Sequence, residues 1–326
     1  QESRGLGDVY KRQMLFLFVL LLSLTGMLKA QVTTAGMSGK VMADEESVIG
    51  ATVVAVHEPS GTSYGTVTNV DGRFSLQGMR SGGPYKVTVS YIGYQTAIYT
   101  DIQLQLGETY SLNVTLHEAS ELLGEITITA SKSKFSAEKT GATTNISSEQ
   151  LTTLPSINRS ISDFTRISPY ASGNSFGGRD GRSNTFTVDG ANLNNNFGLS
   201  SGLPGGGNPI SLDAIDEVQV VIAPYDVRQA NFIGAGINAI TKSGTNAYRG
   251  SAYMYFNNEV MRGNKIGDTD FGVRAEESKT VYGATFGGPI IKDKLFFFAN
   301  VEYEKSPQQV ITWRAAKEGE TPNNST

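Results

Sequence analysis

The residues whose types and spacing come closest to a chemical site lie in the stretch 186–212, FTVDGANLNNNFGLSSGLPGGGNPISL. Loops rich in glycine, asparagine and aspartate can hold phosphate or metal ions. A phosphate-binding P-loop needs Lys-Ser or Lys-Thr after its glycines, whereas Asn-Pro follows the glycines at 205–207. A calcium loop needs several spaced carboxylates, but none lies between Asp189 and Asp213. The stretch therefore predicts a strand that ends in an Asp-Gly turn, a long polar loop and a short helix.

Catalytic constellations are also lacking. His57 and His117 are the two histidines, and they are too far apart in the sequence to support a zinc-peptidase ligand set or a Ser-His-Asp arrangement. Cysteine is absent, which excludes disulfides, thiolate zinc sites and cysteine nucleophiles. We predict that the protein is not an enzyme and binds no cofactor.

The composition favours a β-protein and gives no sign of nucleic-acid binding. A length of 326 residues allows two or three domains at about 100–200 residues each. Charged residues make up 18 % and the net charge is -4, so no large basic field points to nucleic acid. Short apolar runs bounded by glycine, aspartate and asparagine, with 14 tyrosines and 15 phenylalanines, favour a mainly β fold.

The elements that must position any site begin after two N-terminal segments. Residues 1–13 share no pattern with the rest of the chain and are interpreted as a non-native leader. Residues 14–30 are apolar up to Leu24 and end in small or polar residues. The run is shorter than the roughly 20 residues that span a bilayer, so it predicts a signal peptide and an exported protein.

Residues 31–118 contain strand-length runs at close spacing, GKVMA, GATVVAVHE, YGTVTNVDGRFSL, YKVTVSYIGY and YSLNVTLHE. These runs predict a small β-sandwich, with Asp71-Gly72 at a tight hairpin turn that requires positive φ. The predicted core is Val53, Val56, Phe74, Leu76, Val87 and Val89. The stretch resembles the carboxypeptidase-regulatory-like domain, whose fold is a prealbumin-like sandwich.

Residues 119–139 form a linker around the segment EITITA, which alternates apolar and polar side chains. The pattern suits an ordinary strand and equally a strand donated to the sheet edge of another protein. The segment consists of Glu125, Ile126, Thr127, Ile128, Thr129 and Ala130.

Residues 140–245 have a mixed pattern that predicts a small α/β unit with long polar loops. SSEQLTTLP and SISDFTRISP predict short helices, with Ser147 or Ser148 and Ser160 or Ser162 as N-caps. NTFTVDG, DEVQVVIAP and GAGINAITKSG predict strands. Loops of this length in a compact domain usually have a function or are mobile.

Residues 246–326 predict longer antiparallel strands, YRGSAYMYFNN, KTVYGATFGGPI and KLFFFANVEYEK, with GGPIIKDK as the connector between the last two. Alternation in the last run places Val301 and Tyr303 on one face and Glu302 and Glu304 on the other. This pattern, at 9–11 residues, is typical of transmembrane β-strands, although a soluble sandwich uses similar strands. An open sheet edge is not tolerated in hydrocarbon, so we expect an incomplete barrel from a truncated sequence.

These segments, in this order, resemble the TonB-dependent outer-membrane receptors of the Bacteroidetes type. EITITA resembles their TonB box, TFTVDGANLNNNF and DAIDEVQVVIAPYDVRQANFIGAGINAITKSGTN resemble plug motifs, and YRGSAYMYFNN with FGGPIIKDKLFFFANVEYEK resembles the first barrel hairpins. The plug ends in GINAITKSGTNAYRGSAY, which is closer to the Oar-like than to the SusC-like branch.

The resemblance implies active transport of a ligand across the outer membrane, energised by the inner-membrane protein TonB and gated by the plug. The ligand is undefined and could be a glycan, a peptide or a protein, and a surface lipoprotein is a further partner to consider. Polar contacts between plug and barrel are expected from Arg179, Asp180, Arg182, Glu302 and Glu304. A ligand-facing plug loop is expected at Asn192, Asn194, Asn195 and Asn196, although asparagine also favours turns. The alternative is a secreted or surface β-protein that binds glycan or matrix without transport.

Overall fold

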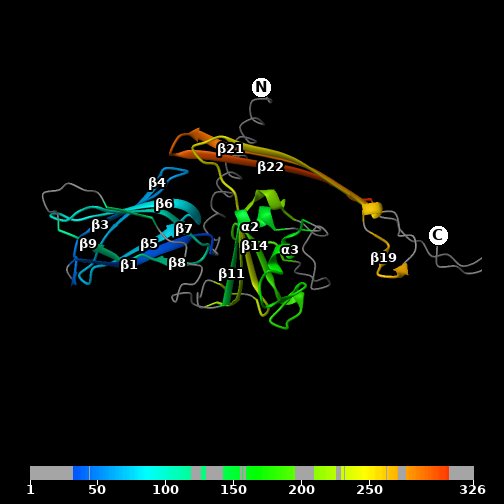
Figure 1. The fold of residues 1–326 in the computed structure, drawn as a ribbon, viewed down its shortest axis with the longest axis horizontal. Helices are drawn as coiled ribbons and strands as arrows, with labels where there is room; N and C mark the ends of the chain where they lie inside the picture. The colour runs from blue at the N-terminus through cyan, green and yellow to red at the C-terminus, as the bar shows by residue number, and fades with distance from the viewer. Residues whose placement is uncertain are drawn as a thin grey trace, which may run out of the picture.

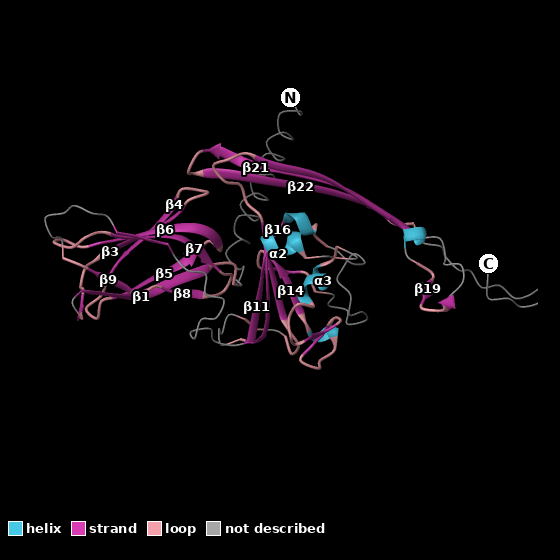
Figure 2. Ribbon diagram, in the orientation of Figure 1, coloured by secondary structure: helices cyan, strands magenta, loops and turns pink. Residues whose placement is uncertain are grey.

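The computed structural model describes most of the chain between Val32 and Pro307, in three parts. Figure 1 shows a β-sandwich, an α/β unit beside it, and a long curved sheet that passes over the α/β unit. Most described residues are in strands, and the helices are short (Figure 2), so the predicted mainly β fold is confirmed. The described residues are 32–43, 45–118, 126–129 (backbone alone), 142–154, 156, 159–194, 209–224, 229–230, 232–261, 263–270 and 277–307.

The sandwich consists of two sheets that enclose one apolar core. In one sheet β1 pairs with β2 and β5 and, in parallel, with β8 and β9, and the other has the order β10-β7-β6-β3-β4. Alternation buries Phe74 and Leu76 of β5 and Tyr85, Val87 and Val89 of β6, and these side chains meet between the sheets. The strands are β1 Ala35–Ala43, β2 Glu46–Ser47, β3 Thr52–His57, β4 Thr62–Val67, β5 Arg73–Met79, β6 Gly82–Ser90, β7 Ala97–Leu104, β8 Thr109–Ser111, β9 Val114–Leu116 and β10 Ile126–Thr129.

Two predictions for the sandwich need correction. Five of the six predicted core residues are buried, but Val56 is half-buried on the opposite face, because the period of two in β3 turns Val53, Ala55 and His57 inward. The turn before β5 does contain a residue with positive φ, Gly72 at 71°. It joins strands of different sheets, however, and is therefore not a hairpin.

The α/β unit is a five-stranded sheet of order β11-β16-β17-β14-β15 with two short helices. The helices begin after Ser147 and Ser160, and each N-cap is supported by the side chain three residues later, Gln150 or Asp163. The predicted helices and strands of this unit are confirmed. Its elements are β11 Ala142–Ser147, α2 Ser148–Thr153, α3 Ile161–Thr165, β12 Ala171–Ser172, β13 Ser175–Phe176, η2 Gly181–Ser183, β14 Thr185–Val188, β15 Ala191–Asn192, η4 Leu212–Ala214, β16 Ile215–Ala223 and β17 Gly236–Thr241.

The third part is an antiparallel sheet of order β18-β21-β22. The segment GGPII, predicted as connector, belongs to β21, because Pro289 is accommodated at a register shift near the strand end. The connector is residues 292–294. The elements are β18 Arg249–Asn258, η5 Glu259–Met261, β19 Lys265–Ile266, β20 Thr269–Asp270, β21 Ser278–Ile291 and β22 Leu295–Lys305.

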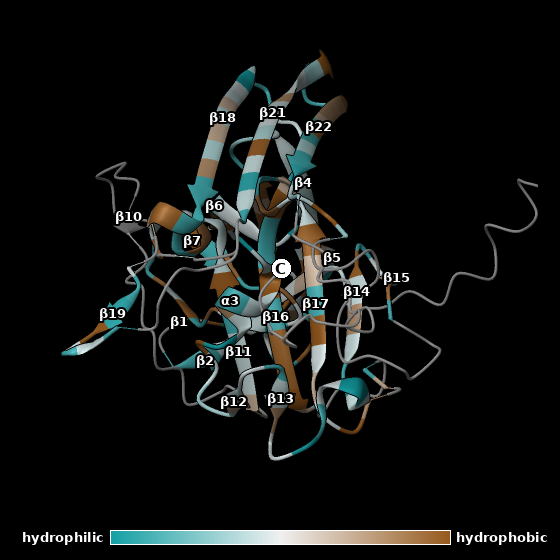
Figure 3. Cartoon of the chain, turned by 90° about the vertical axis from the view of Figure 1, so that its right-hand side faces the viewer, coloured by the Kyte–Doolittle hydropathy of each residue, from teal (hydrophilic) through white to brown (hydrophobic). Residues whose placement is uncertain are grey.

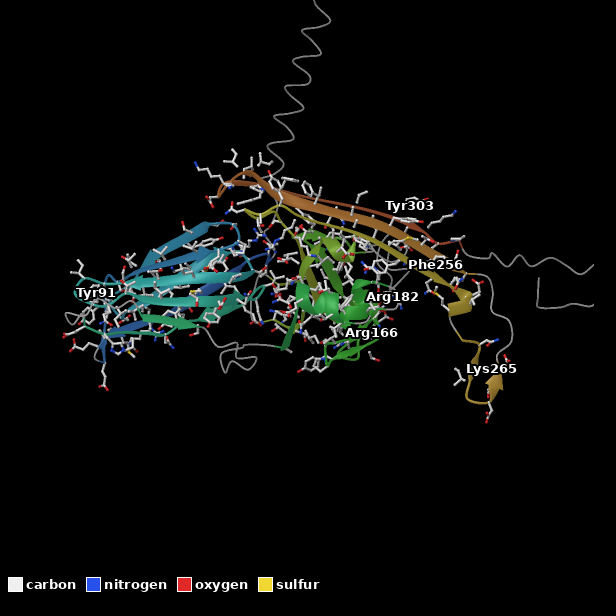
Figure 4. The ribbon with its side chains drawn as sticks, turned by 45° about the horizontal axis from the view of Figure 1, so that its top comes forward. Tyr91, Arg166, Arg182, Phe256, Lys265 and Tyr303 are labelled. Atoms are coloured by element: carbon white, nitrogen blue, oxygen red, sulfur yellow. The ribbon has the colours of Figure 1, made fainter. Side chains whose placement is uncertain are left out.

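The outer face of this three-stranded sheet is apolar and exposed. Met254, Tyr282 and Tyr303 are direct neighbours across the three strands, and their exposed fractions are 60 %, 50 % and 63 %. Figure 3 shows the alternation as bands of opposite hydropathy along β18 and β21, and Figure 4 shows Phe256 and Tyr303 on this sheet. In the described part of the chain, no helix is long and apolar enough to span a membrane.

Candidate functional site

The α/β unit is bonded to the inner face of the three-stranded sheet by a polar cluster. Ser211, the N-cap of η4, has its Oγ atom 2.9 Å from Glu302 Oε2 and 2.9 Å from Tyr253 Oη. Tyr253 donates a hydrogen bond of 2.7 Å to the same carboxylate oxygen. Tyr253 lies on β18 and Glu302 on β22, so one serine of the α/β unit reaches two strands of the sheet.

A glycine makes this contact across β21 possible. Gly283 lies in register between Tyr253 and Glu302, and the tyrosine ring crosses over it. A Cβ atom at position 283 would lie 2.1 Å from Cζ of Tyr253, which is far inside van der Waals contact. Position 283 must therefore lack a side chain for the tyrosine hydroxyl to reach the carboxylate.

Arg159 forms a second link between the α/β unit and the sheet. Its guanidinium forms an ion pair with Asp213 of η4 and lies 3.7 Å from the ring centroid of Tyr255 on β18. A guanidinium over an aromatic face is stabilised by the ring quadrupole, more so when both are partly desolvated. The side chain of Arg159 is 20 % exposed, so this contact contributes to the attachment of the α/β unit. We define the seam cluster as Arg159, Ser211, Asp213, Tyr253, Tyr255 and Glu302.

Most of the seam cluster was missed by sequence reasoning. Glu302 was predicted as a polar contact of the inner face, and its partners Tyr253 and Ser211 lie 49 and 91 residues away in the chain. The alternation in SAYMYFNN carried a signal, because Tyr253 and Tyr255 share the strand face opposite the exposed Met254. Nothing in the local sequence marked Arg159 or Ser211.

Three of the other predicted plug–barrel residues, Asp180, Arg182 and Glu304, have local partners in the structure. The Arg182 guanidinium pairs with Asp180, with 3.0 Å between Nε and Oδ1, and Arg179 is exposed. The hydrogen bonds and charge of Arg182 hold the pKa of Asp180 below its ordinary value. Glu304 pairs with Lys279 within the three-stranded sheet, at 3.0 Å. A contact of Arg179, Asp180 or Arg182 with a barrel wall stays a prediction.

The predicted ligand-facing asparagines are described in part. The Asn194 side chain accepts a hydrogen bond of 2.6 Å from the Phe186 amide, and Asn192 accepts one of 2.8 Å from the Asn194 amide. These bonds fix the turn after β14, so the two oxygens hold the loop in place. Asn195 and Asn196 lie outside the described residues. A role of the four asparagines in ligand contact stays a prediction.

The segment EITITA is placed on the sandwich. Its residues 126–129 form β10, which pairs in parallel with the first half of β7, Ile126 opposite Ala97 and Ile128 opposite Tyr99. Glu125 and Ala130 lie outside the described residues. The strand therefore extends a sheet of its own chain. A role of this segment as a TonB box stays a prediction.

A buried junction between the sandwich and the α/β unit is centred on Leu106, which is fully buried. Its amide donates to both carboxylate oxygens of Glu217 at 3.1 Å, and its carbonyl accepts from the side-chain amides of Gln219 and Asn145. Both backbone groups of Leu106 are thus satisfied by side chains of β11 and β16. The sandwich also contacts the segment that leads into β18, where the Asn246 amide donates to the Pro59 carbonyl at 2.9 Å.

Glu217 and His57 have pKa values that differ widely from their ordinary values because both side chains are buried. Burial raises the pKa of Glu217 to about 7. The hydrogen bond from the Leu106 amide lowers this pKa, whereas the negative charges of Asp216 and Glu108 raise it further. Burial, followed by the charge of Arg80, lowers the pKa of His57 to about 4. The His57 ring hydrogen-bonds to Ser60 at 2.7 Å and belongs to the sandwich core. Among the described residues no group of three His, Asp or Glu side chains could hold a metal ion.

Comparison with known proteins gives matches to both ends of the described chain. Residues 36–117 match the family model of the carboxypeptidase regulatory-like domain, which confirms the resemblance predicted for that stretch. Residues 240–316 match the outer membrane beta barrel domain. The TonB-dependent transporter Oar of Myxococcus xanthus is 26 % identical over 252 residues, which are 72 % of this chain and 23 % of that protein. The chain thus spans about a quarter of the length of this curated relative.

Solved structures resemble the chain less closely. The siderophore receptor PirA from Acinetobacter baumannii gives a TM-score of 0.38 at 23 % identity, over 51 % of this chain and 24 % of that one. The Bacillus anthracis TIE protein gives a TM-score of 0.24 at 19 % identity, over 26 % of this chain and 17 % of that one. These scores are too low to carry an argument about function.

Proposed function

Because the chain belongs to the TonB-dependent receptors and is located in the outer membrane, we propose that it is part of a transporter that moves a ligand across that membrane with energy delivered by TonB. The observation that carries the proposal is the two-sided three-stranded sheet. Its outer face presents Met254, Tyr282 and Tyr303, as lipid contact requires, and its inner face binds the α/β unit through Glu302.

In this proposal the α/β unit is the plug and the seam cluster is the contact that holds it in the barrel. The cluster has few direct bonds, and they are polar, so water can replace each of them when the plug moves. A wall of interlocked apolar side chains would be harder to separate, because separation would expose apolar area to water. This polarity supports a plug that gates the barrel.

The proposed TonB contact is the segment Glu125 to Ala130. Strand addition uses backbone hydrogen bonds, so it tolerates varied side chains and requires free N–H and C=O groups. Replacing Ile128 with proline removes one donor and fixes φ, whereas replacing it with valine changes neither. We expect Ile128→Pro to abolish binding of the purified full-length receptor to the periplasmic C-terminal domain of TonB, and Ile128→Val to retain it.

The measurement is titration of the TonB domain against each receptor variant in detergent, after fractionation has located the receptor in the outer membrane. Equal binding by Ile128→Pro and Ile128→Val would contradict the TonB-box assignment. Recovery of the full-length protein from the culture medium would instead favour the secreted glycan- or matrix-binding protein. The ligand, whether glycan, peptide or protein, and any surface lipoprotein partner are to be sought by co-purification with the full-length receptor.

A further inference from the structure

The sandwich holds β10 at the edge of a sheet. In the described part of the chain β10 pairs only with β7, which in turn pairs with β6 on its other side. Four successive residues are in register, from Ile126 opposite Ala97 to Thr129 opposite Thr100. In a strand the backbone groups of successive residues point alternately to either side, so pairing with β7 uses only half of those in β10.

The outward backbone groups of β10 are those that a strand of a partner would pair with. An exposed strand edge is a template for another strand, which is why proteins usually cover or shorten such edges. A free segment must lose backbone conformational entropy before it can pair with a partner. Residues 126–129 have already lost most of this freedom on β7, so the sandwich prepares the strand for binding.

The position of the strand is fixed as well as its conformation. β7 ends at Leu104, and Leu106 is bonded to Glu217 and Gln219 of the α/β unit two residues later. The sandwich is also bonded to the segment that leads into β18, through Pro59 and Asn246, and Asn246 is bonded in turn to Asp293 in the β21–β22 connector at 2.7 Å. The sandwich that carries β10 is therefore anchored to both the α/β unit and the three-stranded sheet (Figure 1).

We propose that the sandwich is the scaffold that presents residues 126–129 to TonB, whose strand adds to the outward edge of β10 while β10 stays paired with β7. The inference rests on the proposed function, because it takes residues 126–129 as the TonB contact. The opposite arrangement, in which the sandwich occupies the strand and competes with TonB, predicts the reverse dependence on β7–β10 pairing. One covalent lock distinguishes the two.

The lock is the double variant Thr100→Cys/Thr129→Cys in the full-length receptor. The two positions are opposite each other in register, and strands in a sheet are about 4.7–4.9 Å apart, within the Cα separation of about 4.4–6.8 Å that a disulfide bridges. The 326 residues contain no cysteine that could compete for the bridge. The oxidised and reduced forms of one preparation are then compared for binding to the TonB domain, with the two single-cysteine variants as controls for thiol modification.

We expect the bridge to form and the oxidised receptor to bind the TonB domain with a Kd equal to or lower than that of the reduced receptor. Binding by the reduced form and weaker binding by the oxidised form would overturn the scaffold and indicate competition. Failure of both the disulfide and a short bismaleimide to bridge the two cysteines would also overturn it, because β10 would not lie on β7. Absence of binding in both forms and in the unmodified receptor would overturn the proposed TonB contact itself.

Discussion

The junction at Leu106 is predicted to weaken as the pH rises, because Glu217 must ionise in a buried position. The exposed fraction of Glu217 is 7 %, and its pKa is raised from 4.5 to about 7. A group whose pKa is raised on folding contributes stability that is complete below its unfolded value and is lost as the pH rises through the folded value. For Glu217 the loss of stability therefore begins near pH 4.5 and is complete above about pH 7.

The size of the effect can be worked from the same two values. One pKa unit corresponds to about 1.4 kcal/mol, so the local free energy of opening should fall by roughly 2 to 3 kcal/mol between about pH 5 and about pH 8. This is a fall of about 30- to 150-fold in the protection of the Leu106 amide against hydrogen exchange, once the intrinsic rate at each pH has been divided out. Glu217→Gln keeps an acceptor for the Leu106 amide but cannot ionise, so its protection should vary much less.

The assay is hydrogen exchange followed by mass spectrometry on the full-length receptor, using peptides that contain Leu106 or β16. Asp216 is half-buried and its pKa is also raised, mainly by burial, so a shallower slope of the same sign should persist in Glu217→Gln. Glu108→Gln, which removes a smaller contribution to the pKa of Glu217, should reduce the slope only slightly. A pH-independent wild-type junction, or equal slopes in wild type and Glu217→Gln, would refute the reasoning.

Two further predictions concern the three-stranded sheet. Gly283→Ala places a Cβ atom 2.1 Å from the Tyr253 ring and should lower the stability of the full-length receptor by about 1–3 kcal/mol, whereas Gly263→Ala, with no atom within 4 Å, should be neutral in the same denaturant titration in detergent. Val301→Arg puts a charge on the apolar outer face and should cost about 2–4 kcal/mol of membrane insertion if the position lies near the bilayer midplane. Unfolding in the presence of lipid vesicles measures this cost, and unchanged stability would argue against lipid contact at Val301.

The sequence predicted the elements whose determinants are local. Short apolar runs bounded by turn residues marked strands in all three parts, and serine N-caps marked the two helix starts, Ser147 and Ser160. The inward face of β3 was misassigned because His57 is buried there and Val56 is not. A strand pattern with apolar residues on both faces leaves the inward side undetermined until the second sheet is in place.

Only the tertiary structure decided which faces meet. Glu302 was visible in the sequence as a carboxylate on the strand face opposite the apolar one, but its contact with Ser211 depends on the α/β unit lying against the inner face of the sheet. Glu217 gave no sequence signal, since its burial and raised pKa arise when the turn after β7 docks on β16. The sequence also left the pairing of β10 with β7 undetermined. Strand pairing uses backbone hydrogen bonds, so the side chains of a strand do not specify which sheet edge it will join. Periodicity and capping act over a few residues, whereas these contacts join segments that only the packing of whole sheets brings together.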